Sequence, residues 1–97
     1  MNEYLLLMHD DVPPGAANGA DWGSYLSKLH ASGAFDGGSS IGRGVCVRKH
    51  GDPNAPLAVT GFLRVRAESL EAALRHLDGN PDFEAGGTAE VRELVRD

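Results

Sequence analysis

Hydrophobic residues are densest at the start of the chain, in the run from Glu3 to His9. An unbroken apolar run of this length is typical of a central strand covered on both faces. Asp10 and Asp11 follow it, and the prolines of the segment 12–15 cannot continue a sheet ladder. The pattern therefore predicts a first strand over 3–9 that ends at the two acids.

The next apolar residues recur at helical spacing: Trp22, Tyr25, Leu26 and Leu29. The small, polar stretch 15–20 before them predicts a loop, and Asp21 is a favourable N-cap. With Asp21 before it and Gly33 after it, this spacing predicts a helix from about 22 to about 32. Gly33 is expected to end the helix in the left-handed backbone conformation.

A glycine-rich stretch, AFDGGSSIGRG, follows this helix. No Gly-Lys-Ser/Thr sequence and no long helix follow it, so we interpret it as a connector rather than a phosphate-binding loop. Residues 45–48 predict a second strand, and 50–54 have the composition of a turn. Residues 57–66 then predict a third strand, paired with the second as a hairpin.

The last third of the chain alternates between strand and helix patterns. In the third strand Val59, Gly61, Leu63 and Val65 face one way, while Thr60, Phe62, Arg64 and Arg66 face the other. Ser69 predicts the cap of a second helix, with an apolar stripe of Leu70, Ala73, Leu74 and Leu77. Gly79 is expected to end this helix, Pro81 to prevent its resumption, and 89–95 to form a final strand.

This order of elements predicts an α+β domain of ferredoxin-like β-α-β-β-α-β type, with a four-stranded antiparallel sheet and both helices on one face. The expected strand order is 4-1-3-2. The opposite face would present Phe62, Arg64, Glu90 and Arg92. Because a half-apolar sheet face is unfavourable in water, we expect a second copy to cover it and form a homodimer.

Composition limits the number of domains, the class of partner and the cellular compartment. Ninety-seven residues fit a single domain over 1–97, and the net charge of −5 argues against nucleic acid as a partner. Cys46 is the only cysteine, so no internal disulfide forms and a reduced, cytoplasmic setting is the simplest interpretation. The apolar run 4–8 is too short to span a membrane.

The expected topology gathers several chemical groups at one end of the sheet. These are His9, Asp10, Trp22, Tyr25, His50 and the segment 81–84. Beside a helix N-terminus, which favours anions, they form a candidate pocket for a small organic ligand. Each also has a structural interpretation: Trp22 and Tyr25 as core residues, His50 as a solvated turn residue, His9 and Asp10 as an ordinary strand end.

Arg64 and Arg92 form a second candidate group together with Glu90. They are either a structural network of ion pairs on the sheet face or a site for a carboxylate-bearing ligand. No spacing motif indicates a metal site, and no cofactor is expected.

Three stretches carry a family resemblance. They are YLLLMHDD, the pattern W-x-x-Y-L-x-x-L followed by Ser-Gly-Ala-Phe, and GFLRVRAESLEAALRHLDGNPDFEAGGTAEVREL. With them the chain resembles the YCII-related family, especially the branch called DGPF-domain proteins. The resemblance implies a dimeric α+β barrel, in which two four-stranded sheets face each other, and in some members a catalytic aspartate–histidine pair.

The chain departs from this family pattern in two places. The hairpin reads GDPNAPLAVTGF in place of Asp-Gly-Pro-Phe, and the helical histidine position falls near Tyr25. Carried over to this sequence, the catalytic pair becomes Asp10 and Tyr25. The first hypothesis is a homodimer that binds a small molecule, with weak lyase-type acid–base chemistry at this pair. The second hypothesis is a non-catalytic accessory or regulatory dimer that binds a protein partner. A third, a cofactor-free monooxygenase, rests on fold analogy alone.

Overall fold

The structure is a computed structural model that describes residues 1–16 and 21–96. Of the predicted loop 15–20, residues 17–20 therefore lie outside the described residues. The described elements are, in order, β1 (Asn2–His9), α1 (Trp22–Ala31), β2 (Phe35–Ser40), β3 (Val59–Ala67), α2 (Leu70–Arg75), α3 (Pro81–Glu84) and β4 (Ala89–Leu94).

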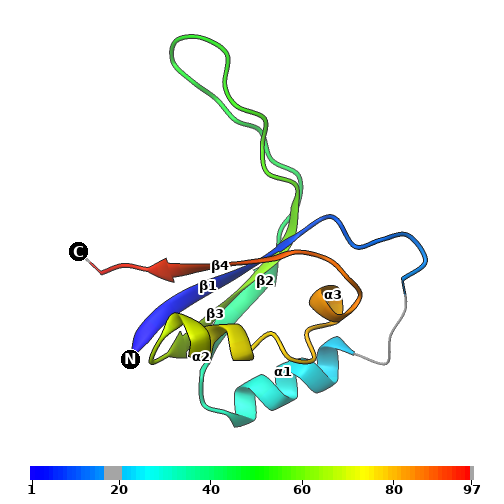
Figure 1. Cartoon of the computed structure of the whole chain (residues 1–97). Helices are drawn as coiled ribbons and strands as arrows, with labels where there is room; N and C mark the ends of the chain where they lie inside the picture. Colours follow the sequence, from blue (N-terminus) through cyan, green and yellow to red (C-terminus); the bar gives the residue numbers. More distant parts are fainter. Residues whose placement is uncertain (17–20, 97) are drawn as a thin grey trace.

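The strands form a four-stranded antiparallel sheet in the order β2-β3-β1-β4. The three helices lie on one face of this sheet, and no described helix covers the other face (Figure 1). The architecture is thus α+β, as the pattern predicted, and β1 lies in the interior of the sheet.

β1 alternates between a buried and a half-buried face. Tyr4, Leu6 and Met8 are buried towards the helices, where Leu6 lies between Leu63 of β3 and Val91 of β4. Leu5 and Leu7 point to the other face and remain half-buried. The expectation that both faces of this strand are covered is therefore wrong for a single chain.

The second strand lies earlier in the chain than predicted. The glycine-rich stretch interpreted as a connector forms the edge strand β2, whereas residues 45–48 belong to no strand and are exposed. Residues 41–58 form a long excursion between β2 and β3 that projects from the body of the protein (Figure 1), which we call the arm. Valines usually indicate a strand, but here they have no strand to pair with, while Gly38 pairs closely with Leu63 because it has no side chain.

Both caps predicted for the two longer helices are present. Asp21 accepts hydrogen bonds from the backbone N–H groups of Gly23 and Ser24, and Ser69 accepts one from Ala72. Tyr25 and Leu29 of α1 enter the core as predicted.

The predicted apolar stripe of the second helix is only half correct. α2 ends at Arg75, and Ala73 and the following Leu77 are buried, but Leu70 and Leu74 are exposed. The short helix presents only one narrow side to the sheet. The leucines on its flanks therefore remain in solvent.

α2 does not resume at Pro81, as predicted, but Pro81 begins the short separate helix α3, which was not predicted. Pro81 occupies the first turn of α3, where its missing N–H is not needed, and buried Asn80 caps the helix by accepting from the N–H of Phe83 at 3.1 Å. α3 carries Asp82 towards Thr60 at the start of β3, which positions one of the groups of the site described next.

Candidate functional site

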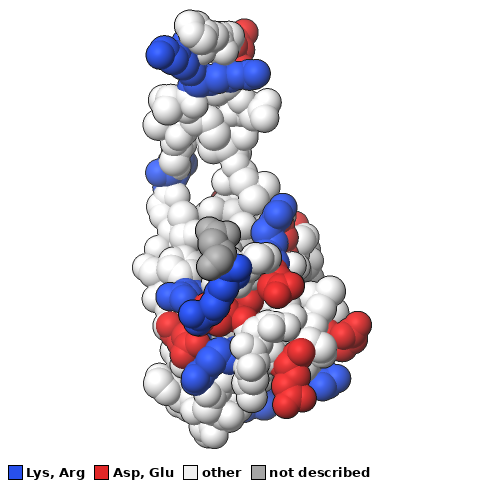
Figure 2. Space-filling model, turned by 90° about the vertical axis from the view of Figure 1, so that its left-hand side faces the viewer, with Lys and Arg blue, Asp and Glu red and all other residues white. Residues whose placement is uncertain are grey.

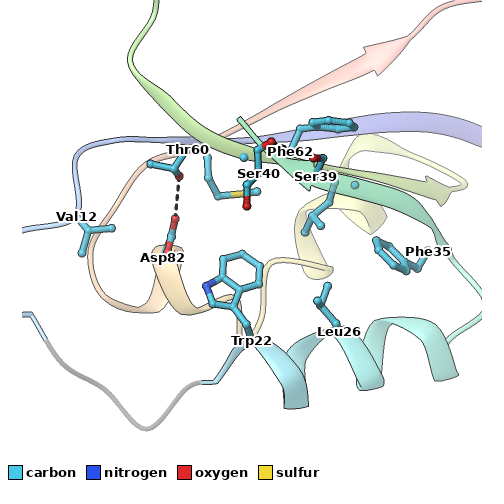
Figure 3. A pocket seen from close by; sticks show the side chains of 13 residues that line it. Val12, Trp22, Leu26, Phe35, Ser39, Ser40, Thr60, Phe62 and Asp82 are labelled. Carbon is cyan, nitrogen blue, oxygen red and sulfur yellow. Dashed lines mark hydrogen bonds between the residues drawn. The ribbon is translucent and has the colours of Figure 1, made fainter. Parts of the chain in front are cut away.

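A hollow with a mostly apolar lining lies between α1 and the part of the sheet formed by β2 and β3. Its volume is about 550 Å³, and we call it the α1–β3 pocket (Figure 3). It is lined by Met8, Val12, Trp22, Leu26, Phe35, Gly38, Ser39, Ser40, Thr60, Gly61, Phe62, Leu63 and Asp82.

Two glycines explain why this space is open. Gly61 pairs with Met8 and Ser40, and Gly38 pairs with Leu63, so both glycines lie on the helix-facing side of the sheet. Further along β3 the same face carries Leu63 and Val65, which fill the core. The absence of side chains at the two glycines leaves a gap above the start of α1.

The floor and one wall of the pocket are apolar. Trp22 and Leu26 point from α1 towards the sheet, and Phe35 of β2 lies to one side (Figure 3). The indole of Trp22 packs edge-to-face on Tyr25, with ring centroids 5.7 Å apart, yet 37% of Trp22 remains exposed. This arrangement offers a held aromatic surface to a ligand.

The opposite wall is polar. The hydroxyl of Thr60 donates to Oδ2 of Asp82 at 3.3 Å, which joins β3 to α3 across the pocket edge (Figure 3). Ser40 of β2 adds a second hydroxyl. Among the described residues that line the pocket, Asp82 is the only one with an ionisable side chain. The site therefore combines an aromatic floor with one carboxylate and the hydroxyl residues Ser39, Ser40 and Thr60.

Sequence reasoning identified part of this site. Trp22 and the segment 81–84 were expected together, and Trp22 and Asp82 do line one pocket. Phe35, Ser40 and Thr60 were missed. Phe35 and Ser40 lie in the strand that the pattern placed elsewhere, and nothing in the sequence marked them.

The structure does not bring Asp10 and Tyr25 to one pocket. Tyr25 is buried, its hydroxyl donates to the carbonyl oxygen of His76 at 2.7 Å, and burial raises its pKa above the ordinary value. Asp10 instead lines a second pocket of about 450 Å³ at the base of the arm. Its neighbours there include Arg43 and Leu57.

His9 and His50 also lie apart from Trp22. His9 Nε2 is 2.8 Å from Oε1 of Glu90 on the sheet face that no described helix covers. His50 is exposed near the tip of the arm. The predicted gathering of these groups at one end is therefore divided among the α1–β3 pocket, the arm and the uncovered sheet face.

Arg64 and Arg92 lie on that uncovered face and are paired within the chain. Arg64 is 3.7 Å from Glu3, which also accepts from Arg96 at 2.9 Å, and Arg92 donates to Glu90. The hydrogen bonds from Arg92 and then His9 lower the pKa of the Glu90 carboxyl. Within one chain these charges form two separate groups of ion pairs, one around Glu3 and one around Glu90.

The N-terminus of α1 has little capacity left for an anion. The carboxylate of Asp21 already accepts from the amides of Gly23 and Ser24 and from the Ser24 hydroxyl, and these bonds lower its pKa. Two of the amides on which the predicted anion preference depends are therefore already paired within the chain. Among the described residues, no group of three His, Cys, Asp or Glu side chains is arranged to hold a metal ion.

No family model matches the chain, and no curated protein matches it at a significant level. The resemblance to the YCII-related family stays a prediction from sequence motifs. Within the described residues, no helix is both long enough and apolar enough to cross a membrane.

Proposed function

We propose that this chain is the subunit of a homodimeric protein that binds a small organic molecule in the α1–β3 pocket. The observation that carries the proposal is the pocket itself, whose volume of about 550 Å³ lies in the range of small-molecule sites. Its lining also has the composition of such sites, with a mostly apolar surface and a few convergent polar groups.

The proposal concerns binding and not catalysis at Asp10 and Tyr25. Lyase-type chemistry would need these two groups around one substrate, within hydrogen-bond reach of it. The Tyr25 hydroxyl is instead bonded to a backbone carbonyl in the interior, and Asp10 borders a different pocket.

The homodimer is proposed from the uncovered face of the sheet. Leu5, Leu7 and Phe62 share this face, since Leu7 is directly opposite Phe62 and Leu5 lies opposite Arg64 and Arg92. Half-buried apolar residues beside internally paired charges suit an interface, because the charges are neutralised before they lose water. Two such sheets face to face would form the dimeric α+β barrel of a ferredoxin-like, YCII-related protein in a cytoplasmic setting.

A matched pair of serine substitutions tests ligand binding. Ser40→Leu adds an apolar side chain at the pocket wall, whereas Ser27→Leu adds the same side chain to the exposed part of α1. A bound ligand raises the melting temperature, because it binds the folded chain and not the unfolded one. In a screen of small aromatic and aliphatic compounds, we expect shifts for the wild type and Ser27→Leu that are lost in Ser40→Leu.

Two results would contradict the proposal. One is a screen in which no compound raises the melting temperature of the wild type. The other is an equal shift in Ser40→Leu, which would place the binding outside the α1–β3 pocket.

A protein partner is the second candidate function, and the arm favours it. Val45 and Val47 are 87% and 89% exposed, and basic side chains gather at the far end of the arm, where Arg48 and Lys49 lie (Figure 2). An extended segment with exposed valines and cationic ends is typical of surfaces that dock on another macromolecule. Replacing both valines with serine should then abolish partner capture without changing the melting temperature.

A further inference from the structure

We propose that the ligand of the α1–β3 pocket is a small organic cation, a primary ammonium or amidinium group carried on a flat apolar body. This inference rests on the proposed function, because it names the chemical class of the ligand for that same site. It follows from the charge of the pocket, the condition of the neighbouring helix ends and the position of the aromatic floor.

Charge gives the first step. Asp82 supplies a carboxylate at the pocket wall, and the lining that the structure describes contains no Lys, Arg or His. A negative group with no cation beside it in the pocket attracts a ligand of positive charge. The same negative charge would repel a ligand that carries a carboxylate or a phosphate.

The neighbouring backbone amides give the second step. An anion could still bind at free backbone amides near the helix starts, but four amides near the starts of α1 and α3 have side-chain partners inside the chain. The Asp21 carboxylate accepts hydrogen bonds from the amides of Gly23 and Ser24 at 3.2 and 3.0 Å. The Asn80 side chain accepts one from the amide of Phe83. Glu84 takes the amide of Gly79 at 2.9 Å. These four amides are therefore not free to hold an anion.

Geometry gives the third step. Asp82 and Thr60 form the polar wall, while Trp22 rises from α1 on the other side of the same space (Figure 3). An ammonium between them can donate to the carboxylate and lie over the indole, which attracts cations through its π face. Leu26 and Phe35 then cover the apolar body of the ligand.

Three probes that share one ring separate charge from shape. They are 2-phenylethylamine, which is a cation at neutral pH, 2-phenylethanol, which is neutral, and phenylacetate, which is an anion. Trp22 is the only tryptophan of the chain and lines the pocket, so its fluorescence reports binding directly. We expect the amine to bind at least about tenfold more tightly than the alcohol, and phenylacetate to bind most weakly.

Substitution of Asp82 assigns the preference to one residue. Asp82→Asn should weaken amine binding about tenfold and leave the alcohol nearly unchanged, while Asp82→Glu should restore part of the preference. Asp52→Asn, at an exposed position in the arm, is the matched control and should change nothing. Circular dichroism and the alcohol affinity show whether the Asp82 variants keep their fold.

The outcomes separate this inference from the function on which it rests. If the alcohol or phenylacetate binds as tightly as the amine, or if Asp82→Asn leaves the preference intact, the cation inference is overturned while pocket binding stands. If none of the three probes changes the fluorescence of Trp22 at millimolar concentration, the cation inference is overturned, and the compound screen with Ser40→Leu decides the function separately.

Discussion

Asp11 is the residue that joins the end of β1 to the start of β4. Its carboxylate accepts from the backbone N–H of Thr88 at 2.7 Å and from the Thr88 hydroxyl. These bonds to Thr88 are the main cause that lowers the pKa of Asp11 below its ordinary value of 3.8. A single side chain thus fixes two chain segments that are 77 residues apart in sequence.

The lowered pKa predicts how stability depends on pH. The folded chain holds Asp11 ionised to a lower pH than the unfolded chain does, so the unfolded chain takes up the proton first as pH falls. The stabilising effect is therefore present above about pH 4 and is lost as pH decreases through the folded-state pKa. Asp11→Asn should lower the melting temperature at pH 7 and reduce its further decrease between pH 5 and pH 3, as measured by calorimetry at intervals of about half a pH unit.

Asp10→Asn is the control for this prediction, because the neighbouring acid is exposed at the edge of the arm. An equal loss of melting temperature in both variants at pH 7 would contradict the assignment to the Thr88 bonds.

The choice between these two acids shows what the sequence could not decide at the scale of single residues. Strand alternation assigns faces only while the ladder is regular, and the pairing of β1 with β3 shifts between Met8 and His9. Past that irregularity the sequence gives no means of deciding which aspartate turns towards β4. The helix caps Asp21 and Ser69 were predictable, because a cap acts on amides two or three residues away.

At the scale of elements, the close pairing of the edge strand β2 with β3 depends on Gly38. A Cβ added to Gly38 would lie far inside van der Waals contact of the Phe62 carbonyl oxygen and 2.8 Å from Cδ2 of Leu63. The pairing of β2 with β3 also shifts between Phe35 and Gly38. The close approach of the two strands therefore depends on the absence of a side chain at this position.

Gly38→Ala should destabilise the protein by about 1–3 kcal/mol, the usual cost of forcing extra atoms into a packed site. Gly42→Ala is the matched control, since a Cβ there meets nothing within 4 Å, and we expect it to change stability by less than about 0.5 kcal/mol. Urea unfolding of both variants measures the difference. Equal midpoints would show that β2 does not need the glycine.

The sequence predicted most elements, did not predict the short helix α3, and misplaced β2 for a physical reason. Apolar periodicity located β1, α1, β3 and β4, because their buried faces need large side chains. β2 buries mainly backbone against β3, so its residues Asp36–Ser40 carry no apolar alternation. The pocket depends on this strand and on Gly61, which is why its outline could not be predicted from patterns of large residues.

At the scale of the whole molecule, the uncovered sheet face is the surface to test for whether the chain is a monomer or a dimer. Leu5 is the informative position, because it lies directly between Arg64 and Arg92 on the neighbouring strands. In an isolated chain, a glutamate at this position would lie between two positively charged arginines and would be tolerated. In a dimer, it would place a carboxylate in the centre of the interface, which is unfavourable.

Leu5→Glu should therefore separate folding from association. We expect the variant to sediment as a monomer at micromolar concentration and to keep the circular dichroism spectrum of the fold, while the wild type sediments as a dimer. A monomeric wild type, or a dimer that survives the substitution, would contradict the two-sheet arrangement. The sequence could suggest this face from alternation alone, but only the register shows which charges surround Leu5.

The arm has one further consequence, for how the protein responds to a break in its chain. A protease that cuts at the basic residues near the exposed tip would divide the sheet between two pieces, with β1 and β2 in the first and β3 and β4 in the second. Each piece would keep strands that pair only with strands of the other, so the nicked protein would remain assembled through its ladders. Once unfolded, however, the two pieces would have to meet by diffusion, and refolding would change from a first-order reaction into one that depends on concentration.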